Sequence, residues 1–143
     1  MMQSSARICG LFDNHKPSYM TTIHLTNEDT EKLHMVKAVL EARYFNHFTH
    51  QELAQMVGTN ENKLRVGFKY LHNSTIYEYQ TTIRIDKAKE LLANSEMSLK
   101  LIAMRVGLDQ SNLVKSFKRV TGYTPRQWRL NNRKGYYYWE SES

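Results

Sequence analysis

The 143-residue sequence is poor in cysteine, proline and glycine, and each shortage excludes a class of protein. One cysteine, Cys9, cannot form an internal disulfide or supply a multi-cysteine metal site. No run of 18 apolar residues is present, and Met1 to Leu11 lacks the apolar stretch of a secretory signal. Two prolines and six glycines do not suggest a disordered chain, and a hydrophobic content of 41% is typical of a folded domain. We therefore expect a cytoplasmic protein that does not enter a membrane.

The sequence also lacks the patterns that carry catalysis. It contains no Ser/His/Asp array, no glycine-rich phosphate loop and no paired-carboxylate pattern. The six histidines are scattered, and His47 and His50 straddle a predicted helix start, which does not suit a metal site. We expect a protein that is not an enzyme and that uses no cofactor or metal ion.

Positive charge is concentrated in the second part of the chain. The formal net charge is +6, but residues 26–59 carry three basic and five acidic side chains, whereas residues 60–143 carry fifteen and eight. Residues 115–134 hold seven lysines and arginines and no acidic residue. Such a block either solvates a helix surface or contacts a polyanion such as the DNA backbone. Charge by itself leaves both interpretations open.

A gapless internal repeat organises the chain. Displaced by 49 residues, segment 51–80 falls on segment 100–129 with seven identical positions out of thirty. The identical pairs are Ala54/Ala103, Val57/Val106, Gly58/Gly107, Leu64/Leu113, Phe68/Phe117, Lys69/Lys118 and Thr75/Thr124. A tetratricopeptide-like solenoid does not fit, because the period is too long and only two copies are present. A repeated helical hairpin and a repeated helix-turn-helix unit remain.

The matched positions are those that a helix-turn-helix unit requires. Thr49 and Glu52 form a predicted capping box at the start of a short helix. Gly58 stands where the chain must turn with a positive φ, which glycine adopts without a Cβ clash, and Asn60 stands where a second helix needs a cap. The corresponding residues of the second copy are Ser98, Gly107 and Asp109. The pattern therefore predicts two helix-turn-helix units.

The second helix of each unit has apolar residues at i, i+4 and i+7, which predicts one buried face. The residues expected to be buried are Leu64, Phe68 and Leu71 in the first unit and Leu113, Phe117 and Val120 in the second. Asn73 and Gly122 end these helices with residue types that tolerate the left-handed conformation.

The whole pattern predicts an all-α fold of about seven helices, with two helix-turn-helix lobes joined by a long linker helix. The helices expected outside the repeated units are 26–45, 75–94 and 125–132. The predicted segments are an irregular N-terminal stretch (1–25), the first lobe (26–73), the linker helix (74–96), the second lobe (97–134) and an aromatic and acidic tail (135–143).

Several elements occur in a specific order between residues 26 and 132. They are Glu52-Leu53-Ala54 to Gly58, Leu64-x-x-x-Phe68-Lys69, Arg84-x-x-x-Ala88-x-x-Leu91-Leu92, Ile102-Ala103 to Gly107, Phe117-Lys118, and Gly122-x-Thr124-Pro125 to Trp128-Arg129. This arrangement resembles the DNA-binding domain of the AraC/XylS regulators. The resemblance implies a bacterial transcription activator whose two lobes bind one face of the DNA duplex. Most members carry a separate effector or dimerisation domain, which residues 1–25 are too short to form; we expect a standalone member or a fragment.

The candidate DNA contacts are the outward side chains of the two recognition helices, because such a helix presents its N-terminal and outward residues to base edges. They are Asn62, Arg65, Val66 and Lys69 in the first unit, and Gln110, Ser111, Val114, Lys115, Lys118 and Arg119 in the second. Arginine pairs with guanine and asparagine or glutamine with adenine, whereas basic residues further along suit phosphates. We expect a monomer bound to an asymmetric double-stranded DNA site, unless a domain missing from this sequence dimerises the protein.

A protein-interaction module is the alternative. Such a module would bind RNA polymerase or another regulator, with little sequence-specific DNA binding. The acidic balance of the first unit, Leu108 and the aromatic run Tyr136 to Trp139 would supply its surface. That run has a simpler interpretation too, as a tail that folds back on apolar surface.

Overall fold

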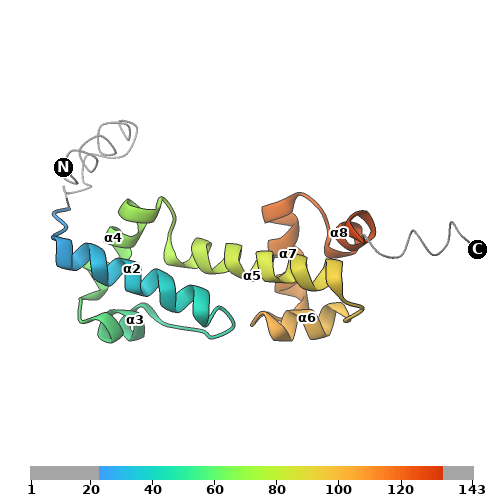
Figure 1. Ribbon diagram of the computed structural model, residues 1–143, viewed down its shortest axis with the longest axis horizontal. Helices are drawn as coiled ribbons and strands as arrows, with labels where there is room; N and C mark the ends of the chain where they lie inside the picture. Colours follow the sequence, from blue (N-terminus) through green and yellow to red (C-terminus); the bar gives the residue numbers. More distant parts are fainter. Residues whose placement is uncertain (1–22, 134–143) are drawn as a thin grey trace, which may run out of the picture.

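The computed structural model describes residues 23–133, which form seven helices and no strand. The helices are α2 (Asn27–Ala42), α3 (His50–Val57), α4 (Glu61–His72), α5 (Ile76–Asn94), α6 (Leu99–Arg105), α7 (Gln110–Thr121) and α8 (Pro125–Asn132). Figure 1 shows two lobes at the two ends of α5, with α2, α3 and α4 in one and α6, α7 and α8 in the other. The predicted all-α fold with two lobes and a long connecting helix is confirmed.

Residues 1–22 of the predicted irregular segment, and the predicted tail 135–143, lie outside the described residues. Leu25, at the end of the predicted irregular segment, packs against the first core. Among residues 23–133, no helix combines the length and the apolar character that crossing a bilayer requires.

Four helices begin with a capping box: α3, where the predicted Thr49 and Glu52 pair is confirmed, and three helices that share the repeat period. Thr26, Thr75 and Thr124 accept a hydrogen bond from the backbone amide three residues later, and the side chain of that residue bonds back to the threonine amide. Each capping box satisfies two backbone amides that the helix leaves without an intrahelical partner. The three threonines are spaced by the 49-residue period, so the repeat extends beyond the copies seen in the sequence. Helices α2, α5 and α8 are therefore equivalent, and α5 belongs to both lobes.

Each lobe has its own hydrophobic core. The first contains Leu33, Val36, Leu40, Leu53, Ala54, Leu64, Phe68 and Ile76. The second contains Ile85, Ala88, Leu92, Ile102, Ala103, Val106, Leu113 and Phe117. The start of α5 closes the first core and its later turns line the second. Burial of these side chains fixes the face that each recognition helix turns inward, and so the face that it leaves to solvent.

Three predictions about these helices are corrected. Helix α2 ends at Ala42 instead of near residue 45, since Arg43 leaves the helical conformation with φ −121° and ψ 45°. Val120 is 40% exposed and is not among the residues that pack on the second core, where Trp128 of α8 packs edge-on against Phe117. Leu71 is only partly buried at the edge of the first core.

His72, in the last turn of α4, lies in an aromatic cluster. Its ring centroid is 4.5 Å from that of Phe68, 5.5 Å from that of His34 and 6.5 Å from that of Tyr79. Burial lowers the pKa of His72 below its usual value, and electrostatic interactions with His34 and Lys37 lower it further, while a backbone hydrogen bond with Leu33 and the charge of Glu41 act in the opposite direction. The folded first lobe therefore favours the neutral imidazole.

We expect the free energy of unfolding to fall as the pH is lowered from about 7 to about 5. Over that range the unfolded chain, with a histidine pKa of about 6.5, binds more protons at His72 than the folded chain does. His72→Phe should reduce this fall, which urea denaturation at both pH values would measure. An equal fall in wild type and His72→Phe would contradict the assignment.

Candidate DNA-binding surface

The first helix-turn-helix unit is formed by α3, a short turn and α4. Gly58 ends α3 in the left-handed conformation, with φ 75°, and the amide of Thr59 then donates to the carbonyl of Ala54 at 2.9 Å. Asn60 caps α4 by accepting a hydrogen bond from the amide of Lys63 at 2.7 Å. The predicted roles of Gly58 and Asn60 are confirmed. The turn redirects the chain within three residues, and α4 packs across α3 on the first core.

The second unit repeats this geometry with α6 and α7. Gly107 has φ 80°, and the amide of Leu108 donates to the carbonyl of Ala103 at 2.8 Å. Asp109 caps α7 through both carboxylate oxygens, which accept from the amide and the side chain of Asn112 at 2.8 and 2.7 Å. The side chain of Leu108 is half-buried and packs against the second core. Leu108 therefore contributes to the core of the lobe, which weakens its interpretation as partner-binding surface.

The predicted contact residues of α4 lie on its solvent side. Asn62, Arg65 and Lys69 are exposed, and Val66 is half-buried. The Arg65 guanidinium donates a hydrogen bond from Nη2 to Oδ1 of Asn62 at 3.2 Å. The two residues are one helical turn apart, so this contact holds the arginine head group toward the N-terminal end of the helix.

The predicted contact residues of α7 are placed in the same way. Gln110, Ser111, Lys115, Lys118 and Arg119 are exposed, and Val114 is half-buried. The helix contains no acidic residue, whereas α4 contains Glu61. The exposed face of α7 is therefore the more positively charged of the two, as the sequence predicted for this half of the chain.

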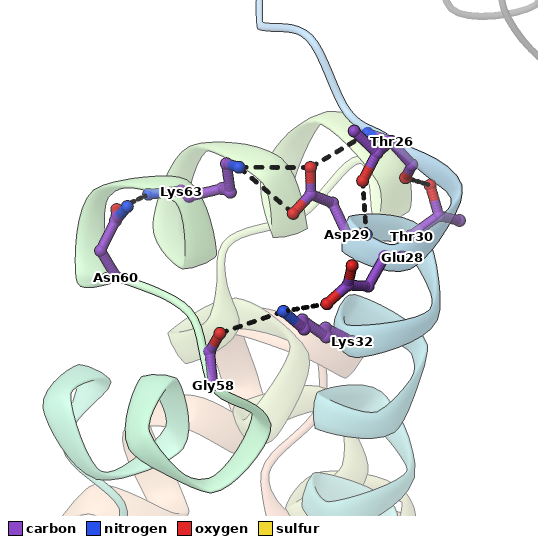
Figure 2. A network of polar contacts seen from close by, with 8 residues as sticks. All are labelled: Thr26, Glu28, Asp29, Thr30, Lys32, Gly58, Asn60 and Lys63. Carbon is purple, nitrogen blue, oxygen red and sulfur yellow. Dashed lines mark hydrogen bonds and ion pairs between the residues drawn. The ribbon is translucent and has the colours of Figure 1, made fainter.

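A polar network joins α2 to the first helix-turn-helix unit (Figure 2). Nζ of Lys63, in the first turn of α4, lies 3.2 Å from both carboxylate oxygens of Asp29. One turn further along α2, Nζ of Lys32 donates to the carbonyl of Gly58 at 3.1 Å and pairs with Glu28 at 2.8 Å. Helix α2 thus holds both the turn and the start of α4.

Asp29 serves two structures at once. Its carboxylate accepts from the amide of Thr26 at 3.0 Å, within the capping box of α2, and also pairs with Lys63. The backbone hydrogen bond from Thr26, together with the Thr26 hydroxyl and Lys63, holds the pKa of Asp29 below its usual value, although burial opposes the shift. The lowered pKa favours the charged carboxylate, which is the form that pairs with the ammonium group of Lys63.

Lys63 was not among the predicted site residues. Its position in the first turn of a recognition helix suggests a DNA contact, but its partner lies 34 residues earlier in the chain. No local pattern identifies such a pair, and the signal appears only when α2 is packed against α4. Within the described part of the chain, no three His, Cys, Asp or Glu side chains are grouped closely enough to hold a metal ion.

Comparison with known sequences points to a common domain. A family described as a helix-turn-helix domain matches residues 53–131. Two relatives are described as the HTH-type transcriptional activator RhaR. The protein from Enterobacter sp. (strain 638) is 30% identical over 117 residues, and that from Klebsiella pneumoniae subsp. pneumoniae is 33% identical over 97. The matches cover 81% and 67% of this chain but 42% and 34% of the relatives. The chain therefore spans less than half the length of these relatives.

Solved structures share the arrangement of helices. The DNA-binding domain of AdpA, described as a global transcriptional factor in complex with a target DNA, is similar with a TM-score of 0.68 and 25% identity, over 71% of this chain and 93% of that one. The C-terminal domain of the response regulator yesN from Fusobacterium nucleatum gives a TM-score of 0.63 and 28% identity, over 67% and 95%. An AraC-type regulator from Chromobacterium violaceum, at 20% identity and a TM-score of 0.68 over 77% and 99%, has the same fold.

We expect Asp29→Ala to lower the free energy of unfolding by about 1–2 kcal/mol, because it removes a cap and an ion-pair partner together. Glu78→Ala is the matched control, since Glu78 closes the capping box of Thr75 on α5 without a lysine partner. Asp29→Ala should lower the free energy of unfolding more than Glu78→Ala does, and this difference should disappear when Lys63 is replaced by methionine. Chemical denaturation of the four variants measures it, and equal costs in both backgrounds would contradict a role for Lys63.

Proposed function

Because this chain belongs to the AraC/XylS family of helix-turn-helix transcription regulators, we propose that it binds double-stranded DNA sequence-specifically and activates transcription. In this proposal α4 and α7 enter successive major grooves on one face of the duplex. The observation that carries it is the division of each recognition helix into a buried apolar face and an exposed polar face. Two such helices, held by separate cores at the two ends of α5, would let one chain contact bases at two places on the duplex.

The exposed face of α4 suits direct reading of bases. Arg65 is assigned a bidentate contact to guanine and Asn62 a contact to adenine. The hydrogen bond between them would be exchanged for bonds to the base edges. Val66 is assigned to a thymine methyl group. Lys69 lies two turns from the N-terminus of α4 and suits a phosphate.

The exposed face of α7 offers different chemistry. Gln110 is assigned to adenine, Val114 to a thymine methyl group, and Ser111 and Lys115 to base edges. Lys118 and Arg119 are in the last turn and suit phosphates. Only the phosphate role of Lys118 matches that of its counterpart, Lys69; the residues assigned to bases differ between α4 and α7, so the proposed site has two unlike halves.

The length of α5 supports reading by a single chain. A helix of 19 residues is about 28 Å long, which is close to the 34 Å between successive major grooves on one face of B-DNA. A monomer would therefore occupy an asymmetric site without a palindrome. The relatives described as activators support the direction of regulation, and the AdpA domain in complex with a target DNA supports the type of ligand.

Selection of bound sequences from a random duplex library, followed by a salt titration on the best sequence, tests the proposal. An enriched, asymmetric motif with two blocks about one helical turn apart would support reading by both units. A single block would mean that only one unit reads bases. Absence of enrichment, with binding that vanishes at moderate salt, would leave only attraction to the backbone. Tight binding to RNA polymerase in that case would favour the protein-interaction module.

We expect Arg65→Ala to weaken binding to the selected site by about 1–3 kcal/mol, or about 5- to 150-fold, and to relax the preference at one base pair. Arg105→Ala is the control, since it removes the same charge from an exposed position on α6. Any loss there should be uniform across sequences. Titration against duplexes carrying all four base pairs at the affected position measures both effects. Unchanged affinity and preference in Arg65→Ala would show that the helix register is wrong.

A further inference from the structure

The loop between α2 and α3, residues 43–49, connects the two lobes; we call it the bridging loop. It starts and ends in the first lobe, but the side chain of Tyr44 packs against the second core. In Figure 1 the loop extends from the end of α2 along α5 toward the other lobe. The lobes are therefore joined by α5 and by a second contact beside it.

A buried arginine holds the bridging loop against α5. Arg84, in the middle of α5, is only 6% exposed. Its Nε donates to the carbonyl of Tyr44 at 2.7 Å and its Nη2 to the carbonyl of Asn46 at 2.8 Å. Two charge-assisted bonds to adjacent parts of one loop fix both its distance from α5 and its orientation.

The bridging loop rests directly on the turn of the second helix-turn-helix unit. A Cβ atom built on Gly107 would lie 2.5 Å from the carbonyl oxygen of Phe45 and 3.0 Å from its carbonyl carbon. The two backbones meet so closely that no side chain fits between them. Gly58, the equivalent glycine of the first unit, has a similar φ of 75°, but a Cβ atom there would meet nothing within 4 Å. The positive φ explains why both positions are glycine. At Gly107, the absence of a side chain also permits the contact between the lobes.

We infer that Arg84 and Gly107 are positioning residues that fix the orientation of the two lobes through the bridging loop, and thereby determine the spacing between the two DNA blocks that the chain accepts. The inference rests on the proposed function for its DNA consequence. Each lobe is packed on its own part of α5, so bending of this helix is what would tilt one lobe relative to the other, and a contact beside the helix opposes that bending. One base pair more or less between the blocks moves the second groove by about 3.4 Å and about 35°.

The two glycines provide a matched pair of variants. Gly107→Ala and Gly58→Ala introduce the same methyl group at nearly the same strained φ, but only Gly107→Ala pushes the bridging loop away. The full chain, with Cys9→Ser and spin labels at Glu31→Cys in α2 and Asn131→Cys in α8, allows the interlobe distance to be measured by pulsed electron paramagnetic resonance without DNA. We expect a narrow distribution in the parent and Gly58→Ala, and a shifted or broader one in Gly107→Ala. Equal distributions in the two glycine variants would overturn the inference.

Binding to a series of duplexes provides the DNA readout. The selected site is lengthened or shortened by one base pair between its two blocks, and affinity is measured for each variant. The parent and Gly58→Ala should lose about tenfold per base pair, the cost of a mismatched contact, whereas Gly107→Ala should lose several-fold less. The same spacing penalty in all three proteins would overturn the inference. A parent protein that selects no sequence would defeat the proposed function and the spacing role with it, while a narrow distance distribution would still support the fixed orientation.

Two arginine variants distinguish the loss of the contact between the lobes from a general loss of stability. Arg84→Met removes the bonds to the bridging loop. Arg129→Met removes similar bonds, from Nε to the carbonyl of Leu92 at 3.2 Å and from Nη2 to that of Met97 at 2.5 Å, which lie within the second lobe. Arg84→Met should broaden the interlobe distance and relax the spacing penalty, and Arg129→Met should change neither. The reverse pattern would overturn the inference even if both variants lose stability.

Discussion

The structure depends on one constraint: α5 must bury apolar side chains in two cores at once. Ile76 closes the first core, and Ile85, Ala88 and Leu92 line the second. Helix α2 and the start of α5 cover the apolar face of α4, whereas α5 and α8 cover that of α7, so α5 is the helix that both cores share. The faces that α4 and α7 leave exposed are set by the cores that α5 completes.

The two lobes are equivalent in backbone but different in their polar contacts. In the first lobe, Lys63 of α4 pairs with Asp29 of α2, and Lys32 reaches the turn. The residue equivalent to Lys63 is Asn112, which bonds to the cap Asp109 of its own helix. The start of α4 is therefore tied to another helix, whereas the start of α7 is stabilised locally. The more positively charged surface belongs to α7, so the lobes differ in charge as well as in support.

Much of the proposed interface could be predicted from helical periodicity. Once Leu64 and Phe68 point inward, the 3.6-residue period leaves Arg65 and Lys69 facing outward, and both are exposed. The same reasoning failed at Val120, which is exposed, whereas Trp128 from another helix packs on the second core beside Phe117. Periodicity defines which face of a helix is apolar, but the neighbouring helices determine how far along the helix that face is covered.

The capping residues, the left-handed turns and the repeated pair of helices can be predicted from the sequence, because each of these depends on residues within a few positions of one another. The partners of Lys63, Arg84 and Gly107 depend instead on how distant segments pack together. Asp29 lies 34 residues before Lys63, and the carbonyl of Tyr44 lies 40 residues before Arg84. Gly107 matches Gly58 in sequence and in φ, yet only Gly107 touches the other lobe. A local pattern specifies a conformation, whereas the packing of distant segments decides what that conformation contacts.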